Sequence, residues 1–235
     1  MRKVAFCVIL GLISSLPAYP ATIFYDDFKN GTKRWEVVSG EWTTVERNGN
    51  GFMQLISPGV TSRVINIKDL LFDDFTVEVR INQVTGDAGA HIFFRNDGQH
   101  GYWFGFVTSG WKGGHDLKDT VHFWKMLPNI SVISTIPLVL PGDQWMLLKV
   151  ETKGKHARMW YQREGIDESY ILAYEGDTLV ELDRGKIGFW AGGGKVLVDY
   201  ILVYDEEGPS QLSVHQADKT PLIWGEIKRR SRCER

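Results

Sequence analysis

Apolar and polar residues alternate along much of the chain with a period of two, which is typical of half-buried β-strands. The clearest case is a segment in which Phe75, Val77, Val79 and Ile81 alternate with polar residues. No stretch carries an apolar stripe with the period of a helix over more than about three turns. Further strand-like segments are predicted at residues 23–27, 35–39, 41–47, 51–57, 62–67, 89–95, 102–108, 119–126, 131–136, 144–151, 156–162, 170–174, 185–190 and 195–204.

Glycine, asparagine and aspartate separate these segments, for example at residues 48–51, 97–98 and 192–194. The chain of 235 residues has 25 Gly, 9 Trp, 8 Tyr and 12 Phe, a composition that suits a β-sandwich with tight turns. So many short strands predict an all-β fold of two packed antiparallel sheets. The formal net charge of −2 gives no reason to expect nucleic acid or an anionic membrane as a partner.

The N-terminus departs from this pattern. A basic start and an apolar run over residues 4–16, followed by Ala18 and Ala21, are typical of a secretory signal. The run is short for a membrane span, so we expect cleavage rather than membrane insertion, with an uncleaved anchor as the alternative. The sequence therefore predicts a signal peptide at 1–21, a domain at 22–206, and a secreted protein in an extracellular or periplasmic location.

After residue 206 the chain becomes polar and turn-rich, and it ends in a short basic segment. We expect a linker and a basic tail at 207–235. A frayed terminus and a docking segment for a protein partner both stay open, because an apolar cluster at 222–224 lies beside the basic residues. Once the leader is removed, Cys233 is the one remaining cysteine, so no internal disulfide is expected.

Three stretches, at residues 23–46, 73–106 and 185–205, resemble the laminin-G-like and concanavalin A-like jelly-roll domains of secreted bacterial proteins. The middle stretch is most similar to the keto-disaccharide hydrolase-type (3-keto-disaccharide hydrolase) domain, in which a G-I-x-F-R strand is followed by a G-Y strand. The first and last stretches are also similar to the ends of glycoside hydrolase family sixteen. The resemblance covers nearly all of 22–206 and implies a curved jelly-roll sandwich whose concave sheet holds the ligand.

The resemblance places ligand-facing side chains on the middle strands. On the first of them, alternation puts His91, Phe93 and Arg95 on one face. On the G-Y strand, the positions that match the family's polar ligand-facing residues are Trp103 and Gly105. Histidine and arginine are also the members of these strands that an apolar core would least accommodate. The expected ligand-binding residues are His91, Phe93, Arg95, Asn96, Trp103, His122 and Trp124, together with Trp111 in the glycine-rich loop that follows.

These residue types suit a sugar. An indole ring can stack on the C–H face of a sugar, while polar side chains reach the hydroxyl groups. We expect Trp103 or Trp124 to be the stacking plate, with Arg95, Asn96 and His122 as hydrogen-bond donors at its rim. The alternative is that each ring belongs to the core. The expected partner is a polysaccharide or oligosaccharide.

A second candidate site surrounds Asp199, the one carboxylate within an otherwise apolar strand. A buried carboxylate needs a cation or several hydrogen-bond donors. In the resembling families, an aspartate in this V-D-Y segment and backbone oxygens near a D-D-F start hold Ca²⁺, which implies a structural calcium site formed by Asp27, Phe28 and Asp199. The alternative partners of Asp199 are backbone N–H groups, Lys33 or Arg34.

Glycoside hydrolysis usually needs two suitably spaced carboxylates. The E-x-D-x-x-E motif of family sixteen is absent, because the corresponding strand reads GYWFGFV. The sequence also contains no Ser-His-Asp order, zinc signature or phosphate-binding glycine loop. We therefore favour a secreted carbohydrate-binding, lectin-like module. A hydrolase or lyase acting on 3-keto-glycosides and a non-catalytic surface or matrix interaction protein are the alternatives.

Overall fold

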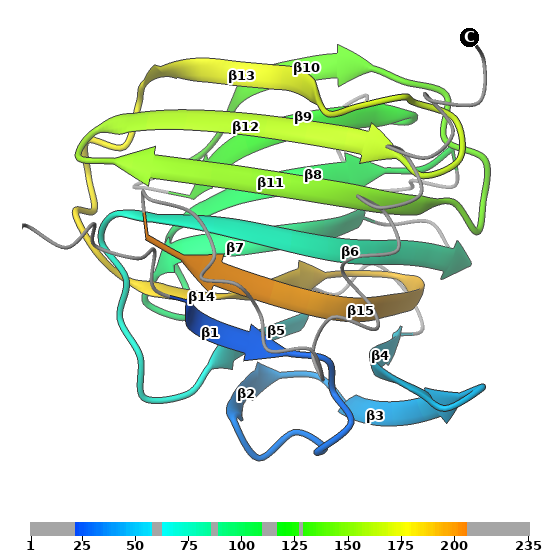
Figure 1. Ribbon diagram of the computed structural model, residues 1–235. Helices are drawn as coiled ribbons and strands as arrows, with labels where there is room; N and C mark the ends of the chain where they lie inside the picture. The colour runs from blue at the N-terminus through cyan, green and yellow to red at the C-terminus, as the bar shows by residue number, and fades with distance from the viewer. Residues whose placement is uncertain (1–21, 58–62, 86–88, 110–116, 127–128, 206–235) are drawn as a thin grey trace, which may run out of the picture.

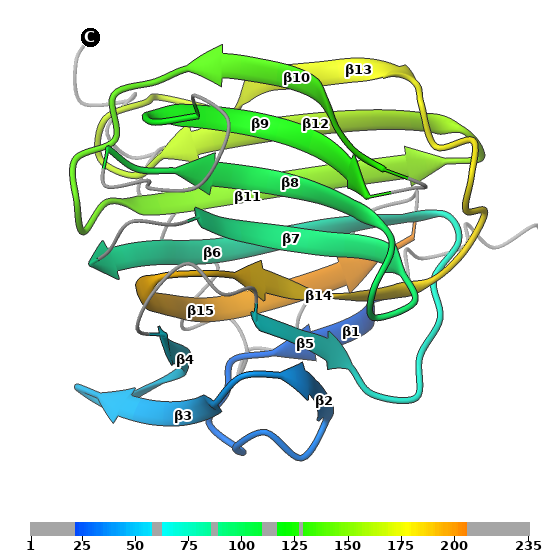
Figure 2. The same cartoon turned by 180° about the vertical axis from the view of Figure 1, so that it is seen from behind.

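The computed structural model describes residues 22–57, 63–85, 89–109, 117–126 and 129–205. The expected leader, Trp111 and the expected tail lie outside these ranges. Every regular element within them is a β-strand, and the strands form two antiparallel sheets packed face to face (Figures 1 and 2). The fold is the predicted all-β jelly-roll sandwich. The described residues contain no helix that is long and apolar enough to cross a membrane.

Sheet A has eight strands in the order β13-β12-β11-β6-β15-β4-β3, and β1 also pairs with β15. The long strands β6 and β15 pair along most of their length at its centre. The strands of sheet A are β1 (Thr22–Asp26), β3 (Trp42–Arg47), β4 (Asn50–Ser57), β6 (Phe75–Thr85), β11 (Trp145–Lys153), β12 (His156–Arg163), β13 (Ile171–Asp177) and β15 (Gly194–Tyr204).

Sheet B has seven strands in the order β10-β9-β8-β7-β14-β5-β2. Its middle strands β7, β8 and β9 follow one another along the chain as antiparallel neighbours, so residues that face each other can be read from their register. The strands of sheet B are β2 (Trp35–Ser39), β5 (Arg63–Ile67), β7 (Gly89–Asn96), β8 (Tyr102–Val107), β9 (Thr120–Met126), β10 (Ile130–Pro137) and β14 (Lys186–Ala191).

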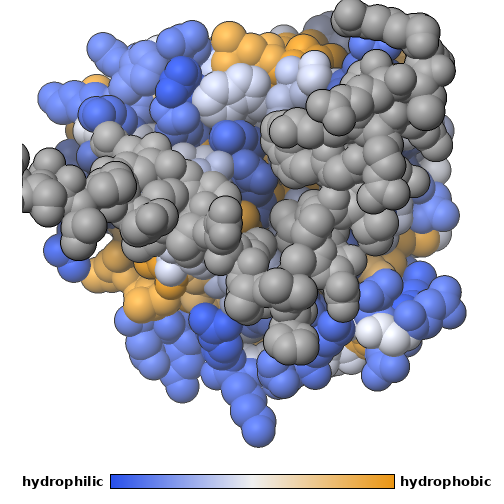
Figure 3. Space-filling model, in the orientation of Figure 1, coloured by the Kyte–Doolittle hydropathy of each residue, from blue (hydrophilic) through white to orange (hydrophobic). Residues whose placement is uncertain are grey.

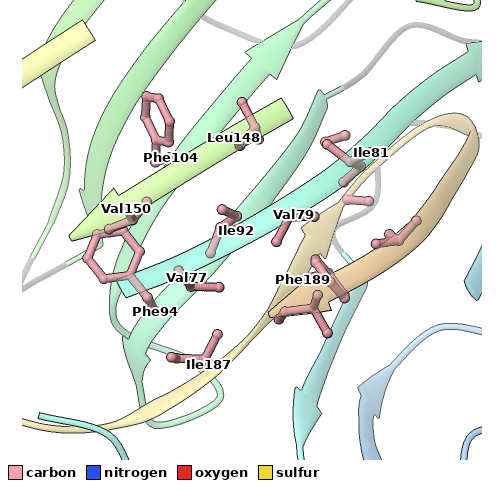
Figure 4. Packing of buried hydrophobic residues seen from close by; sticks show 14 of the residues in the cluster. Val77, Val79, Ile81, Ile92, Phe94, Phe104, Leu148, Val150, Ile187 and Phe189 are labelled. Atoms are coloured by element: carbon pink, nitrogen blue, oxygen red, sulfur yellow. The ribbon is translucent and has the colours of Figure 1, made fainter. Parts of the chain in front are cut away.

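The main core lies between the two sheets. Val77, Val79 and Ile81 of β6 are buried against residues such as Ile92 and Phe94 of β7, as Figure 4 shows. These residues occupy alternate positions of their strands, which is why the period of two in the sequence predicts them. Burial of this apolar surface is the main stabilising contribution, because no disulfide is expected in the domain.

A β-bulge changes the expected faces of β15. Val198 pairs with Ile81 and Tyr200 pairs with Arg80, so Asp199 is the extra residue between them. Alternation alone predicts Val198, Tyr200 and Leu202 on one face, and this prediction is wrong. Val198 is followed on the inner face by Ile201 and Val203, while Tyr200 and Leu202 lie on the outer face, because a bulge reverses the alternation after it.

Candidate functional site

The outer side of sheet B carries a second apolar cluster, separate from the main core. Phe93, Trp103 and Trp124 face one another across β7, β8 and β9, because they are register partners on neighbouring strands. Trp190 on β14 is the register partner of His91 and completes the row. We call this surface the tryptophan face; its members are His91, Phe93, Trp103, His122, Trp124 and Trp190.

The three indole rings pack against one another in stacked and tilted pairs. The ring centroids of Trp103 and Trp190 are 4.8 Å apart with an interplanar angle of 31°, and those of Trp103 and Trp124 are 6.1 Å apart at 26°. Trp103, Trp124 and Trp190 are only 6, 6 and 7% exposed. The sequence reading missed Trp190, although the alternation in β14 puts Phe189 inward and Trp190 outward. The rings form a continuous aromatic cluster that is almost closed to solvent.

Two histidines meet in the middle of the tryptophan face. His91 and His122 are the register partners of Gly105 from either side, and their Nε2 atoms lie 2.7 Å apart across it. A Cβ atom on Gly105 would overlap the carbonyl oxygen of Ala90 and lie 2.6 Å from the Cα atom of His91. Glycine is therefore required at position 105 by the close approach of β7, and the histidine rings cover it.

Hydrogen bonds link this pair to the start of β9. The Thr120 hydroxyl donates to the Leu117 carbonyl at 2.7 Å, and its oxygen lies 3.2 Å from Nδ1 of His122. Nδ1 of His91 is buried and has no hydrogen-bond partner of good geometry.

Both histidines are neutral at physiological pH. Burial lowers the pKa of His122 to about 3. Burial, and next the neighbouring His122 ring, lower the pKa of His91 well below its ordinary value, and the main chain of Trp190 opposes this only in part. The tryptophan face is therefore an uncharged surface, and none of its six members is a carboxylate.

The placement expected for Arg95 is wrong. Phe94 pairs with Ile187 and Asn96 pairs with Lys186, so Arg95 is the extra residue of a β-bulge, with a φ of 42°. Its side chain turns away from the tryptophan face and is fully buried. The guanidinium donates to the main-chain carbonyls of Asp73 and Leu182 and to the Asp74 carboxylate. Arg95 therefore links the residues before β6 to the segment before β14. These bonds stabilise the fold.

The same bulge returns Asn96 to the outer side of sheet B. Its side chain forms a reciprocal amide pair with Asn66, with both N···O distances at 3.0 Å. It also donates to the carbonyls of Phe93 and Lys186 and accepts from the main-chain N–H of Gly98. With these bonds the amide has no free donor or acceptor for a ligand. The hydrogen bonds of Asn96 therefore stabilise the bulge. Trp111 lies outside the described residues.

The residues expected to hold calcium already have other partners. Asp199 accepts from Arg80 at 3.1 Å, rather than from Lys33 or Arg34. Asp27 lies 3.4 Å from the Lys29 ammonium group. The described ranges contain no group of three or more His, Cys, Asp or Glu side chains that could hold a metal ion. A structural calcium ion at Asp27, Phe28 and Asp199 stays a prediction.

The buried aspartate of the D-D-F start is Asp26, which the sequence analysis did not single out. Asp26 is 5% exposed and accepts from the main-chain N–H of Phe28 at 2.8 Å and from Nε1 of Trp35 at 2.9 Å. Phe28 itself has a φ of 60° and is buried in the core. The Asp26 carboxylate therefore accepts one hydrogen bond from the turn that follows β1 and a second from the buried indole of Trp35.

No protein-family model matches the chain, and neither does any curated protein. Among solved structures, it is similar to the carbohydrate binding module CBM66 from Bacillus subtilis, with a TM-score of 0.56 and 20% identity over 72% of this chain and 94% of that one. A Bacillus subtilis protein of unknown function with a galectin-like fold matches with a TM-score of 0.60 and 13% identity, over 80% and 97% of the two chains.

The exoplasmic/lumenal domain of VIP36, in its Ca²⁺/Man2-bound form, matches with a TM-score of 0.53 and 11% identity over 79% of this chain and 85% of that one. At these identities the similarities show the fold alone. The chain has the concanavalin A-like jelly-roll fold that its sequence predicts. The particular likeness to the keto-disaccharide hydrolase-type domain stays a prediction.

Proposed function

We propose that this chain is a secreted, lectin-like module that binds a glycan on the tryptophan face of sheet B. Indole rings suit the C–H faces of sugar rings. The fold supports this proposal, because the similar structures include a carbohydrate binding module and a domain solved with Man2 bound. The absence of carboxylates among the six members of the face favours binding over cleavage.

One observation carries the proposal. Nε1 of Trp103 is buried and has no hydrogen-bond partner. Buried indole N–H groups normally find an acceptor, as those of Trp35 and Trp42 do with Asp26 and Ser39. Leaving such a donor unpaired costs about 1–3 kcal/mol. A ligand oxygen would satisfy it, so the unpaired indole N–H indicates a site that a polar ligand completes.

The free atoms of the face match a hydroxyl group. Trp103 offers a donor through Nε1, and Nδ1 of His91 is a second buried nitrogen without a partner, to which a hydroxyl group can donate or from which it can accept. Hydroxyl groups both accept and donate, whereas a carboxylate only accepts. Because both histidines are neutral, the face has no charge to pair with an acidic ligand. These features favour a neutral glycan over a uronic or sulfated one.

The face must open to admit a sugar ring, since its three indoles are 6–7% exposed in the free chain. We therefore expect association well below the rate of preorganised sites, because binding includes a conformational step. Tryptophan fluorescence should report that step, as the environment of three indoles changes together. Stopped-flow traces with the bound glycan would show a slow phase whose rate saturates with ligand concentration.

Glycan-array screening of the mature chain, followed by titration calorimetry with the best ligand, tests the proposal. Trp103→Phe keeps a stacking ring and removes the N–H group, so we expect binding about tenfold weaker, equivalent to one hydrogen bond. The matched control is Trp160→Phe on the opposite sheet, which should bind like the wild type. Failure to bind any glycan, or an equal loss of affinity in both variants, would contradict a glycan site on the tryptophan face. Turnover of a 3-keto-disaccharide would instead favour the hydrolase alternative.

A further inference from the structure

The strands at the ends of the two sheets differ in charge. Sheet A ends in β13 and β3, and sheet B ends in β10 and β2. A strand at a sheet edge has unpaired main-chain groups, and charged side chains commonly protect it from pairing with another chain. Such residues are present on three of the four edges: Glu36 on β2, Glu46 and Arg47 on β3, and Glu175 and Asp177 on β13.

The fourth edge, β10, has no charged residue. Its sequence is ISVISTIP, which is rich in β-branched residues that favour strands. Ile130 and Val132 are 52% and 42% exposed. Among the described strands β10 pairs only with β9, and Figure 2 shows it as the outermost strand of sheet B. The edge that lacks charged residues is therefore also apolar and open to solvent.

We infer that β10 pairs with β10 of a second copy of this chain, antiparallel and around a two-fold axis. In such pairing each residue faces the one at the same distance on the other side of the axis, so like charges come close only where they lie near the middle of a strand. Self-pairing of β2 or β13 would bring Glu36 or Glu175 close to its own copy, whereas self-pairing of β10 brings together only serine, threonine, proline and aliphatic residues. The net charge of −2 also leaves little repulsion between copies.

The register links this edge to the tryptophan face. Val132 is the register partner of Trp124, so both side chains lie on the outer side of sheet B. A two-fold axis perpendicular to the joined sheet keeps the two tryptophan faces on the same side. The two β9 strands would then be three strand spacings apart, about 14 Å. If the tryptophan face binds glycan as proposed, the dimer would bind one repeating polysaccharide at two positions along its chain.

Sedimentation velocity of the mature chain, over a wide range of concentration, tests the dimer without any ligand. We expect a concentration-dependent dimer, and we expect Val132→Lys to weaken it by at least about 100-fold, because each copy would bring a lysine into the paired apolar edge. The control is Val37→Lys on the opposite edge of the same sheet, where Val37 is 47% exposed. A monomer at every concentration, or a dimer that Val132→Lys leaves intact, would overturn the inference.

Binding to surfaces of different glycan density tests the consequence separately. On a dense surface, Val132→Lys should lose at least about tenfold in apparent affinity through loss of avidity. On a sparse surface, where avidity does not act, it should bind like the wild type; an equal loss on both surfaces would mean that the lysine disturbs the neighbouring Trp124, and would overturn the avidity. If neither protein binds glycan, the proposed function fails while sedimentation still decides the dimer.

Discussion

The same alternating pattern predicts the outer faces of both sheets, but the outer face of sheet A carries ion pairs and the tryptophan face of sheet B is uncharged. On sheet A, Arg80 bonds to Glu164 at 2.6 Å and to Asp199 at 3.1 Å, and its guanidinium lies 3.9 Å from the centre of a Trp145 ring. Glu78 accepts from the Tyr204 hydroxyl and pairs with Lys149. Figure 3, which views the molecule from this side, shows hydrophilic residues over much of its visible described surface.

The tryptophan face of sheet B is uncharged, and its unpaired atoms lie in a layer of aromatic rings. Nε1 of Trp103 and Nδ1 of His91 have no hydrogen-bond partner although both are buried. The comparison teaches that abundant polar chemistry is a poor guide to a binding site, because donors and acceptors that satisfy one another leave little for a ligand. The few atoms left unpaired in an apolar layer are the more informative signal.

The largest effect is expected from Gly105→Ala, which forces β7 and β8 apart beneath the histidine pair. The new Cβ atom would meet main-chain atoms of Ala90 and His91, which cannot move as a flexible side chain can. We expect a loss of about 3 kcal/mol in the free energy of unfolding, at the upper end of overpacking effects. Urea denaturation measures it. Gly142→Ala is the matched control, since nothing lies within 4 Å of a Cβ atom there, and unchanged stability in Gly105→Ala would contradict the packing described.

A smaller effect is expected from acid, through the histidine pair. A histidine with a lowered pKa stabilises the fold fully above its unfolded pKa near 6.5, and this stability is lost progressively as pH falls towards the folded pKa. For His122, with a folded pKa of about 3, the loss between pH 7.5 and 5.0 is about 2 kcal/mol. His156 acts in the opposite direction, because Asp177 raises its pKa, but it is exposed at the surface of sheet A.

Urea denaturation at several pH values between 7.5 and 5.0 measures this loss, above the range in which most carboxylates titrate. His122→Gln keeps a hydrogen-bonding side chain but removes one titrating group, so its stability should depend less steeply on pH. A wild-type free energy of unfolding that is flat over this range would contradict a neutral buried pair. It would also remove the electrostatic contrast between the two faces.

Alternation in the sequence predicts the strands well and the sites less well. Each predicted strand segment corresponds to an observed strand to within a few residues, because a half-buried strand must alternate to bury one face. The failures occur at Arg95 and Asp199, where a β-bulge inserts one residue. A bulge has no clear signature in a single sequence, yet it sends the next side chains to the opposite face.

The composition of the tryptophan face was only partly predictable. His91, Phe93 and Trp103 precede the bulge in β7 or lie on the regular strand β8, so their shared face follows from alternation and register. Trp190 comes from a strand almost a hundred residues away, and only the order of strands in sheet B brings it beside His91. Long-range strand order is set by the packing of the whole sandwich, which local patterns do not encode.

The smallest effect is expected on sheet A, from Arg80→Met. This change keeps an apolar side chain near Trp145 and removes the charge that pairs with Glu164 and Asp199. Because these side chains are partly open to solvent, we expect a loss of only about 1 kcal/mol in urea denaturation. Lys149→Met, which removes the pairing with Glu78, is the control and should cost a few tenths of a kcal/mol.

Repeating the Arg80→Met measurement with EDTA and with calcium separates an arginine from a metal as the partner of Asp199. If Arg80 is the cation that compensates Asp199, EDTA leaves the stability of the wild type unchanged, and calcium does not distinguish wild type from variant. If Asp199 and Asp27 instead hold calcium, EDTA lowers the wild-type free energy of unfolding by mass action and added calcium restores it. That outcome would mean that the outer face of sheet A also has acceptors for a ligand. The two faces would then differ in the kind of ligand that they bind, and not in whether their polar atoms are already paired.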